Sequence, residues 1–188
     1  SPPGDHAVDA DGVGGAFPSF APAASLRSRA VPGLLAFHAH PDDESLSMGG
    51  TLARYAAAGE QVVVVTATRG EVGEIHNHDD PESVRASLGE VREAELRAAC
   101  ELLGVGTLEL LGYRDSGMAG SAENADPGCF WQADFMEAVG RLVRLIRLHR
   151  PEVMTAYDAF GGYGHPDHIQ VHRVGTAAFF GAADVGRF

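Results

Sequence analysis

The feature that most constrains the fold is an alternation of short apolar runs with segments of helical periodicity. The run QVVVVTAT, residues 61–68, is β-branched and apolar at consecutive positions, which is typical of a parallel strand covered on both faces. Similar runs are LLAFH (34–38), TLELL (107–111) and EVMTAY (152–157), and helical patterns follow them over roughly residues 45–58, 84–102, 135–150 and 171–180. This order predicts an α/β domain with a Rossmann-like, mostly parallel sheet and helices on both faces.

Length and charge narrow the class of protein. The 188 residues suit one domain: residues 1–32, rich in Pro, Gly, Ala and Ser, are expected to be a flexible lead-in, and residues 33–188 the α/β domain. A net charge of −12 argues against a nucleic-acid partner and against an anionic membrane surface, and no apolar run has the length of a transmembrane helix. Two cysteines are too few for a disulfide framework, so a cytoplasmic location is expected.

A polar cluster follows each apolar run. The clusters are HAHPDDE (38–44), RGEVGE (69–74), YRDSGM (113–118) and GGYGHPDH (161–168). The carboxyl ends of parallel strands share one edge of the sheet, and ligands bind there in α/β folds. The four clusters therefore predict an active site at this edge.

The first and fourth clusters carry the residue types of a metal centre. If their strands are neighbours, two H-P-D segments face each other, and the residues that they contribute are His40, Asp42, Asp43, His165, Asp167 and His168. Two histidines and one carboxylate leave a position open for water, as in catalytic zinc sites. The remaining carboxylate can act as a general base, and a further histidine can stabilise an oxyanion or protonate a leaving amine. Either segment alone is also compatible with an acidic helix cap; the pairing favours metal binding.

These motifs resemble a known family. AHPDDE early in the chain and GGYGHPDH after a later strand are similar to the PIG-L/LmbE-like zinc N-deacetylases, which remove acetyl groups from N-acetylglucosaminyl conjugates. The segment YRDSGMAG resembles the branch that deacetylates N-acetylglucosaminyl-inositol in the mycothiol pathway. Deacetylases of glycopeptide antibiotics from actinobacteria are also similar, including around CFWQADF.

The resemblance implies a role for each matching residue. One Zn²⁺ per chain would be held by His40, Asp43 and His168, with Asp42 as the general base. The acid or oxyanion stabiliser would be His165, oriented by Asp167, with Tyr163 polarising the amide carbonyl. Contacts to a small glycoconjugate substrate would come from Arg92, Asp115, Met118 and Glu71.

Several alternatives stay open from the sequence. The aglycone could belong to a glycopeptide antibiotic or to a mycothiol S-conjugate cleaved at its amide. The same donors formally fit a non-haem iron oxygenase, although those enzymes resemble all-β barrels, and a non-catalytic sugar-binding module is a third class. Family members usually continue past the last helix seen here, so a truncated chain, a swapped segment or a partner chain is expected to explain the missing elements.

Overall fold

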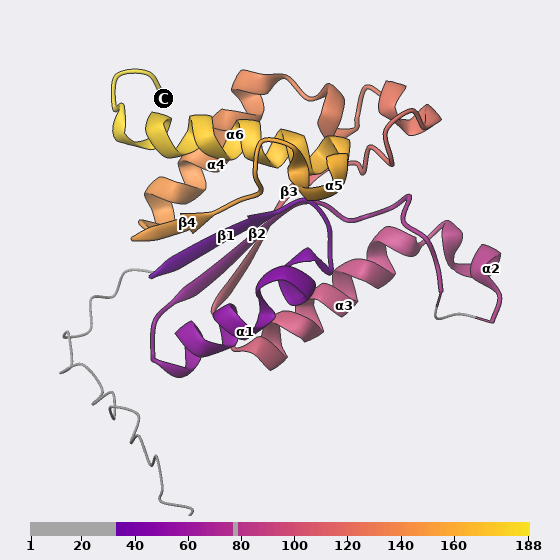
Figure 1. Ribbon diagram of the computed structural model, residues 1–188, viewed down its shortest axis with the longest axis horizontal. Coiled ribbons are helices and arrows are strands. Elements are labelled where there is room, and N and C mark those ends of the chain that lie inside the picture. Colours follow the sequence, from indigo (N-terminus) through magenta and orange to yellow (C-terminus); the bar gives the residue numbers. More distant parts are fainter. Residues whose placement is uncertain (1–32, 77–78) are drawn as a thin grey trace, which may run out of the picture.

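The computed structural model describes residues 33–76 and 79–188 (Figure 1). The lead-in expected at residues 1–32 lies outside the described residues. Four strands form one sheet: β1 (Leu34–His38), β2 (Val62–Thr68), β3 (Thr107–Tyr113) and β4 (Val153–Thr155).

The strand order places the first and fourth polar clusters side by side. The order is β3-β2-β1-β4, and every pairing in this sheet is parallel. Leu34 is aligned with Val62 on one side and with Val153 on the other. The predicted α/β class is confirmed, and so is the neighbouring position of the two strands that precede the H-P-D segments.

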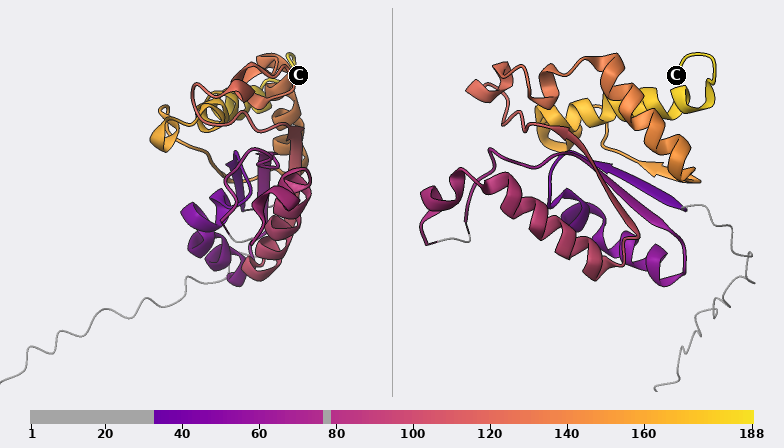
Figure 2. Two further views of the ribbon diagram at one scale, coloured as in Figure 1. Left: turned by 90° about the vertical axis from the view of Figure 1, so that its right-hand side faces the viewer. Right: turned by 180° about the vertical axis from the view of Figure 1, so that it is seen from behind.

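Helices cover both faces of the sheet (Figures 1 and 2). α1 (Asp43–Ala57) and α3 (Leu88–Leu103) pack on one face, around a core that includes Leu34, Val64 and Leu96. α4 (Phe135–His149) and α6 (Pro166–Ala183) pack on the other, around a larger core that includes Phe37 and Leu142. Shorter elements are α2 (Pro81–Arg85), α5 (Gly161–Gly164), η1 (Ala122–Ala125) and η2 (Phe130–Gln132).

Local sequence explains where α4 begins and ends. The Asp134 side chain accepts a hydrogen bond from the backbone N–H of Glu137, which satisfies one of the free donors at the start of the helix. The apolar stripe Val139, Leu142 and Val143 is buried, as its helical spacing predicts. Arg150 ends the helix in the left-handed conformation directly before Pro151.

Two helix boundaries differ from the sequence expectation. The helical pattern after β2 is divided into α2 and α3, because the chain leaves the helical hydrogen-bond ladder at Ala86 and Ser87. α6 begins at Pro166 rather than near Val171. A proline is well suited to the first helical position, since it has no N–H that needs a partner there.

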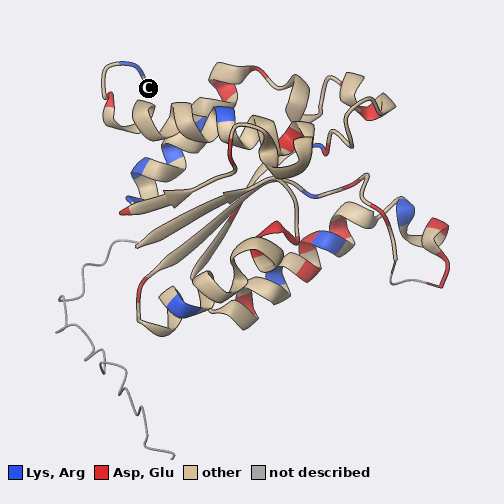
Figure 3. Cartoon of the chain, viewed as in Figure 1, with Lys and Arg blue, Asp and Glu red and all other residues tan. Residues whose placement is uncertain are grey.

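Several acidic residues lie close to the carboxyl ends of the strands. Figure 3 shows acidic residues (red) at the start of α1 and in the loops after β2 and β3. Among the described residues, no helix combines the length and the apolar character that crossing a bilayer requires.

The core on the α4 side gives a stability prediction. Leu142 is fully buried among the residues of this core, whereas Leu148 on the same helix is 69% exposed. Leu142→Ala is expected to lower the free energy of unfolding by about 2–5 kcal/mol, because it removes buried methyl groups and leaves a cavity. The matched control, Leu148→Ala, is expected to change it by less than about 0.5 kcal/mol. Denaturant titration of both variants checks this, and equal losses would contradict the placement of the core.

Candidate metal centre and active site

Two segments far apart in the sequence meet at the carboxyl edge of β1 and β4. His40 follows β1, Asp43 opens α1, and His168 lies in the first turn of α6. Nδ1 of His40 lies 3.3 Å from Nε2 of His168 and 3.5 Å from Oδ2 of Asp43. Nε2 of His168 lies 3.5 Å from Oδ1 of Asp43. The structure thus brings the expected donors together at one point.

The spacing of these donors fits a divalent cation. In a tetrahedral zinc site, bonds of about 2.0–2.1 Å place neighbouring donor atoms about 3.3–3.4 Å apart. The separation of the two histidine nitrogens, 3.3 Å, is close to that value, and one oxygen of Asp43 lies 3.5 Å from each of them, Oδ2 from His40 and Oδ1 from His168. Three donors from the protein leave a fourth position for water or substrate, which is the arrangement of a catalytic rather than a structural site.

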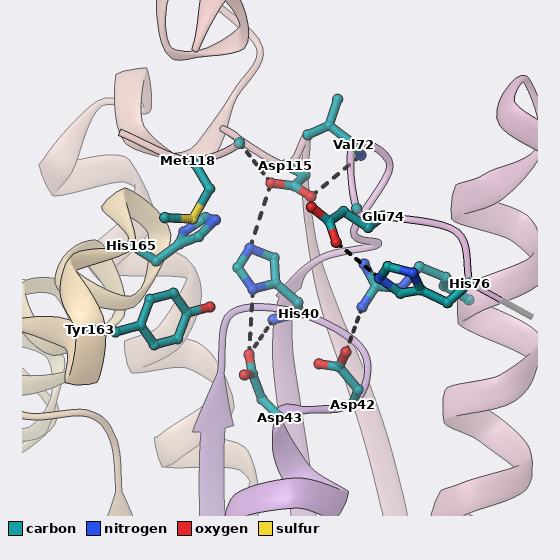
Figure 4. Close-up of a pocket in the computed structure, with 13 residues that line it drawn as sticks. His40, Asp42, Asp43, Val72, Glu74, His76, Asp115, Met118, Tyr163 and His165 are labelled. Atoms are coloured by element: carbon teal, nitrogen blue, oxygen red, sulfur yellow. Dashed lines mark hydrogen bonds and ion pairs between the residues drawn. The ribbon is translucent and has the colours of Figure 1, made fainter. Parts of the chain in front are cut away.

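His40 also belongs to two further groups of residues that could hold a metal ion. His40, His165 and His168 have donor atoms within 4.8 Å of one another, and so have His40, Asp115 and Asp167. The two carboxylates face the opposite ring nitrogen, since Nε2 of His40 lies 3.2 Å from Asp167 and 3.6 Å from Asp115. Figure 4 shows the His40 ring between Asp43 on one side and Asp115 on the other.

The electrostatics of His40 also favour a positive charge at this point. Burial alone would lower the pKa of His40, but the carboxylates Asp115, Asp167 and Asp43 together raise it well above its ordinary value. Burial would raise the pKa of Asp115, yet its hydrogen bonds to His40 and to the backbone of Gly117 lower it to about 2. The pKa of Asp43 is held well below its ordinary value in the same way, by hydrogen bonds to His168 and His40 that outweigh burial. Asp43 and Asp115 thus carry negative charge on opposite sides of the His40 ring, which a cation would balance.

Local backbone features bring His168 into place. Gly161 has φ +69°, and a Cβ atom there would come within 2.8 Å of the His168 Cβ, so only glycine allows α5 to lie so close to α6. The ring of Tyr157 stacks on His168 with centroids 4.1 Å apart. Tyr157 was not singled out from the sequence, because a tyrosine at the end of an apolar strand looks like an ordinary core residue.

Asp42 is held beside the donors by contacts to its backbone and its side chain. Its φ of +109° is unusual for a residue other than glycine. The buried Glu44 carboxylate accepts the backbone N–H of Asp42 at 3.0 Å, and Arg92 donates to Oδ2 of Asp42 at 2.9 Å. Burial raises the pKa of Asp42, and the Arg92 guanidinium partly offsets this. The side chain remains 56% exposed to the cavity side, where a base would meet water.

Arg92 has a structural task in addition to its expected contact with substrate. Its guanidinium donates to the backbone oxygen of Pro41 at 2.5 Å and to that of Gly70 at 3.0 Å, besides Asp42. It therefore ties the loop after β2 to the loop after β1. The sequence reasoning placed Arg92 near the substrate, and it does line the cavity.

His165 and Tyr163 face the donors from the α5–α6 junction (Figure 4). The backbone N–H of Asp167 donates to Nδ1 of His165 at 3.1 Å, so the neutral ring carries its proton on Nε2. Burial, followed by the nearby His40, lowers the pKa of His165 to about 4. Tyr163 is 63% exposed, and its ring centroid lies 5.0 Å from that of His168.

Asp167 contacts His165 through its backbone N–H, while the Asp167 carboxylate contacts Nε2 of His40. The reason is the helix start: His165 is the N-cap of α6, so its side chain accepts from the second residue of the helix. The Asp167 side chain then points toward the loop after β3, where Ser116 donates to it.

A cavity of about 340 Å³ lies over this cluster, which is within the range of small-molecule sites. Asp115 and Met118 line it, together with His76 of the loop after β2. Glu71 accepts the backbone N–H of Asp115 at 3.1 Å, so it supports the loop after β3. His76 forms an ion pair with Glu74, 2.9 Å apart, on the open side of the cavity.

Comparison with known proteins agrees with this geometry. Residues 35–179 match the PIG-L family, which is described as GlcNAc-PI de-N-acetylase. The chain belongs to the PIG-L family. The resemblance carried by the two H-P-D segments is thereby confirmed.

One relative that is about half identical to this chain is named for the reaction that it catalyses. The 1D-myo-inositol 2-acetamido-2-deoxy-alpha-D-glucopyranoside deacetylase of Thermobifida fusca is 51% identical over 161 residues, which cover 80% of this chain and 55% of that protein. The chain thus spans about half the length of the curated relatives that it matches.

Solved structures share the fold of this PIG-L chain. The N,N'-diacetylchitobiose deacetylase of Pyrococcus horikoshii is 25% identical with a TM-score of 0.60, over 79% of this chain and 49% of that one. The 4-carboxy-2-hydroxymuconate hydratase of Pseudomonas putida KT2440 is 26% identical with a TM-score of 0.66, over 84% of this chain and 59% of that one. The fold therefore occurs in proteins of two reaction classes.

Proposed function

We propose that this chain is a zinc-dependent hydrolase that removes the acetyl group from an N-acetylglucosaminyl conjugate, with N-acetylglucosaminyl-inositol as the substrate. The observation that carries the proposal is the meeting of His40, Asp43 and His168 at one point, with Asp42 beside them at the same cavity. The reaction named for the Thermobifida fusca relative supports the choice of substrate.

The residues of this PIG-L chain would divide the chemistry as follows. A zinc ion held by His40, Asp43 and His168 would supply Lewis acidity that activates water and polarises the acetyl carbonyl. Asp42, fixed by Glu44 and Arg92, takes the proton of the attacking water.

The charge that develops on the acetyl oxygen needs hydrogen-bond donors. His165 offers the N–H of Nε2, because its Nδ1 already accepts from the backbone of Asp167. Tyr163 offers its hydroxyl, whose pKa burial raises, so that it stays protonated. Asp42 then delivers the proton that it took from water to the nitrogen of the departing amine, and the products are acetate and the glucosaminyl conjugate with a free amine.

The cavity is expected to bind the sugar through its polar walls. Asp115 and Arg92 present a carboxylate and a guanidinium to hydroxyl groups, and Met118, 53% exposed, gives an apolar contact to one face of the ring. Glu71 contributes by holding the backbone of Asp115. The cavity accommodates a neutral glycoconjugate without a requirement for a charged group.

Other reaction classes have less support. The hydratase with the same fold is 26% identical, whereas the deacetylase of Thermobifida fusca is 51% identical. The oxygenase alternative expects an all-β barrel, and the described residues form a parallel α/β sheet instead. A non-catalytic sugar-binding module would not require Asp42 to be held in an unusual conformation beside the donors.

The test is amide hydrolysis by the zinc-loaded protein, measured as the free glucosaminyl amine formed from three substrates: N-acetylglucosaminyl-inositol, a glycopeptide bearing N-acetylglucosamine, and a mycothiol S-conjugate. We expect the first to have the highest kcat/KM, by at least about tenfold, which corresponds to about 1.4 kcal/mol of transition-state binding. The Asp42→Asn variant in each assay controls for free amine from other sources.

Other outcomes point elsewhere. A higher kcat/KM for the glycopeptide or the S-conjugate would replace the proposed substrate but keep the deacetylase or amidase chemistry. Turnover that needs iron and oxygen, or an absence of free amine from all three, would overturn the proposal. A cytoplasmic location, and a partner chain or swapped segment that completes the site, stay predictions.

A further inference from the structure

Ser116 occupies a position that the mechanism above does not use. It lies in the loop after β3 and is completely buried. Its backbone N–H donates to Oδ2 of Asp167 at 2.9 Å, and its hydroxyl donates to Oδ1 of the same carboxylate. The Ser116 Oγ in turn accepts the backbone N–H of Trp131 at 2.9 Å. Both donor groups of one serine are thus directed to one carboxylate.

Asp167 connects this serine to the metal centre. Its carboxylate is fully buried, and a buried polar group needs hydrogen-bond partners. The Asp167 carboxylate accepts both hydrogen bonds from Ser116 and lies 3.2 Å from Nε2 of His40. The carboxylate at Nε2 holds the His40 ring so that Nδ1 faces Asp43 and His168.

We propose that Ser116 is a positioning residue of the metal centre: by holding the Asp167 carboxylate, it fixes the orientation of His40 for metal binding. The route runs from the backbone of Trp131 through Ser116 and Asp167 to His40. The inference rests on the proposed metal centre and is independent of the substrate.

The first test is the zinc affinity of the Ser116→Ala variant, measured by competition with a chelator at constant pH. The substitution removes the hydroxyl donor and leaves the backbone donor, so we expect the Kd for zinc to rise about tenfold, at the low end of what loss of such a supporting contact costs. The matched control is Ser121→Ala on the same loop. The Ser121 hydroxyl donates to the backbone oxygen of Ser116, not to Asp167, and its loss should leave the Kd within about twofold.

A double-mutant cycle separates this role from a general structural one. Asp167→Asn is expected to raise the Kd for zinc about 10- to 100-fold. Because Ser116 acts through Asp167, the double variant should bind zinc as Asp167→Asn does, with no further loss.

The inference is wrong if Ser116→Ala binds zinc as tightly as the parent protein, or if the two losses multiply in the double variant. If Ser116→Ala does not fold, Ser116→Cys, which is close in volume and a weaker donor, is measured instead and should show an increased Kd. Zinc binding does not depend on acetate release, so this test can succeed when the proposed substrate fails. If the parent protein binds no zinc, the metal centre and the role of Ser116 fail together.

Discussion

Asp42→Asn is expected to lower kcat for acetate release by about 10²- to 10⁴-fold, because the amide cannot accept the proton of the attacking water. The zinc content should not change, since Asp42 is not among the three converging donors. The asparagine keeps the size of the side chain and can still accept from Arg92, so the turn that Glu44 holds is expected to remain folded. Acetate release under saturating substrate, together with metal analysis of the same sample, measures both effects.

The control for Asp42→Asn is another aspartate replaced in the same way. Asp184 caps the C-terminus of α6, and its carboxylate accepts a hydrogen bond from the backbone N–H of Gly186. Asp184→Asn should leave kcat within about twofold of the parent value. Equal activity of Asp42→Asn and the parent protein would exclude Asp42 as the base, whereas loss of zinc from Asp42→Asn would show that it is a ligand.

His168→Ala is expected to weaken zinc binding by roughly 10²- to 10³-fold, with acetate release lost at substoichiometric zinc. An apparent zinc-binding energy of about 10–16 kcal/mol, shared among the ligands of a site, leaves about 3–4 kcal/mol for each. The nearly complete burial of His168 and its stacking on Tyr157 mean that the parent ring is already ordered, so little entropy is lost when it binds a metal.

The matched control is His149→Ala. His149 lies at the end of α4 and pairs with Glu109, 2.9 Å away, outside the metal centre. Its replacement should leave the zinc Kd within about twofold of the parent. Zinc affinity of His168→Ala equal to that of His149→Ala would remove His168 from the ligand set. Chelator treatment of the parent protein should abolish acetate release, and added zinc should restore it.

The arrangement of the site could be predicted from the sequence because it depends on a topological rule. In a parallel sheet all strands end at the same edge, so the four polar clusters had to lie at that edge once the strands were identified. The pairing of β1 with β4 then brought the two H-P-D segments together. The matching of residues 35–179 to the PIG-L family agrees with the motifs that these segments carry.

The contacts that support the ligands could not be predicted in the same way. Ser116, in the segment RDSGM, looks like any loop serine until the fold places it against Asp167, which is 51 residues away. The partner of Asp167 depends on which residue caps α6, and the helix began earlier than its apolar pattern indicates. Glu44 lies in the first turn of α1, and its buried carboxylate accepts the backbone N–H of Asp42. These side-chain contacts depend on how distant segments pack together, and hydrophobic periodicity predicts only the local secondary structure.

The most direct test of the account is an anomalous difference map, recorded at the zinc absorption edge from a crystal of the zinc-loaded protein. The account predicts one peak per chain, bonded to Nδ1 of His40, a carboxylate oxygen of Asp43 and Nε2 of His168, at about 2.0–2.2 Å from each. The other ring nitrogen of His40, Nε2, offers a second possible position for the zinc ion, between Asp115 and Asp167. A peak at Nε2 of His40 in that position, or the absence of a peak near His40, would contradict the proposed metal centre.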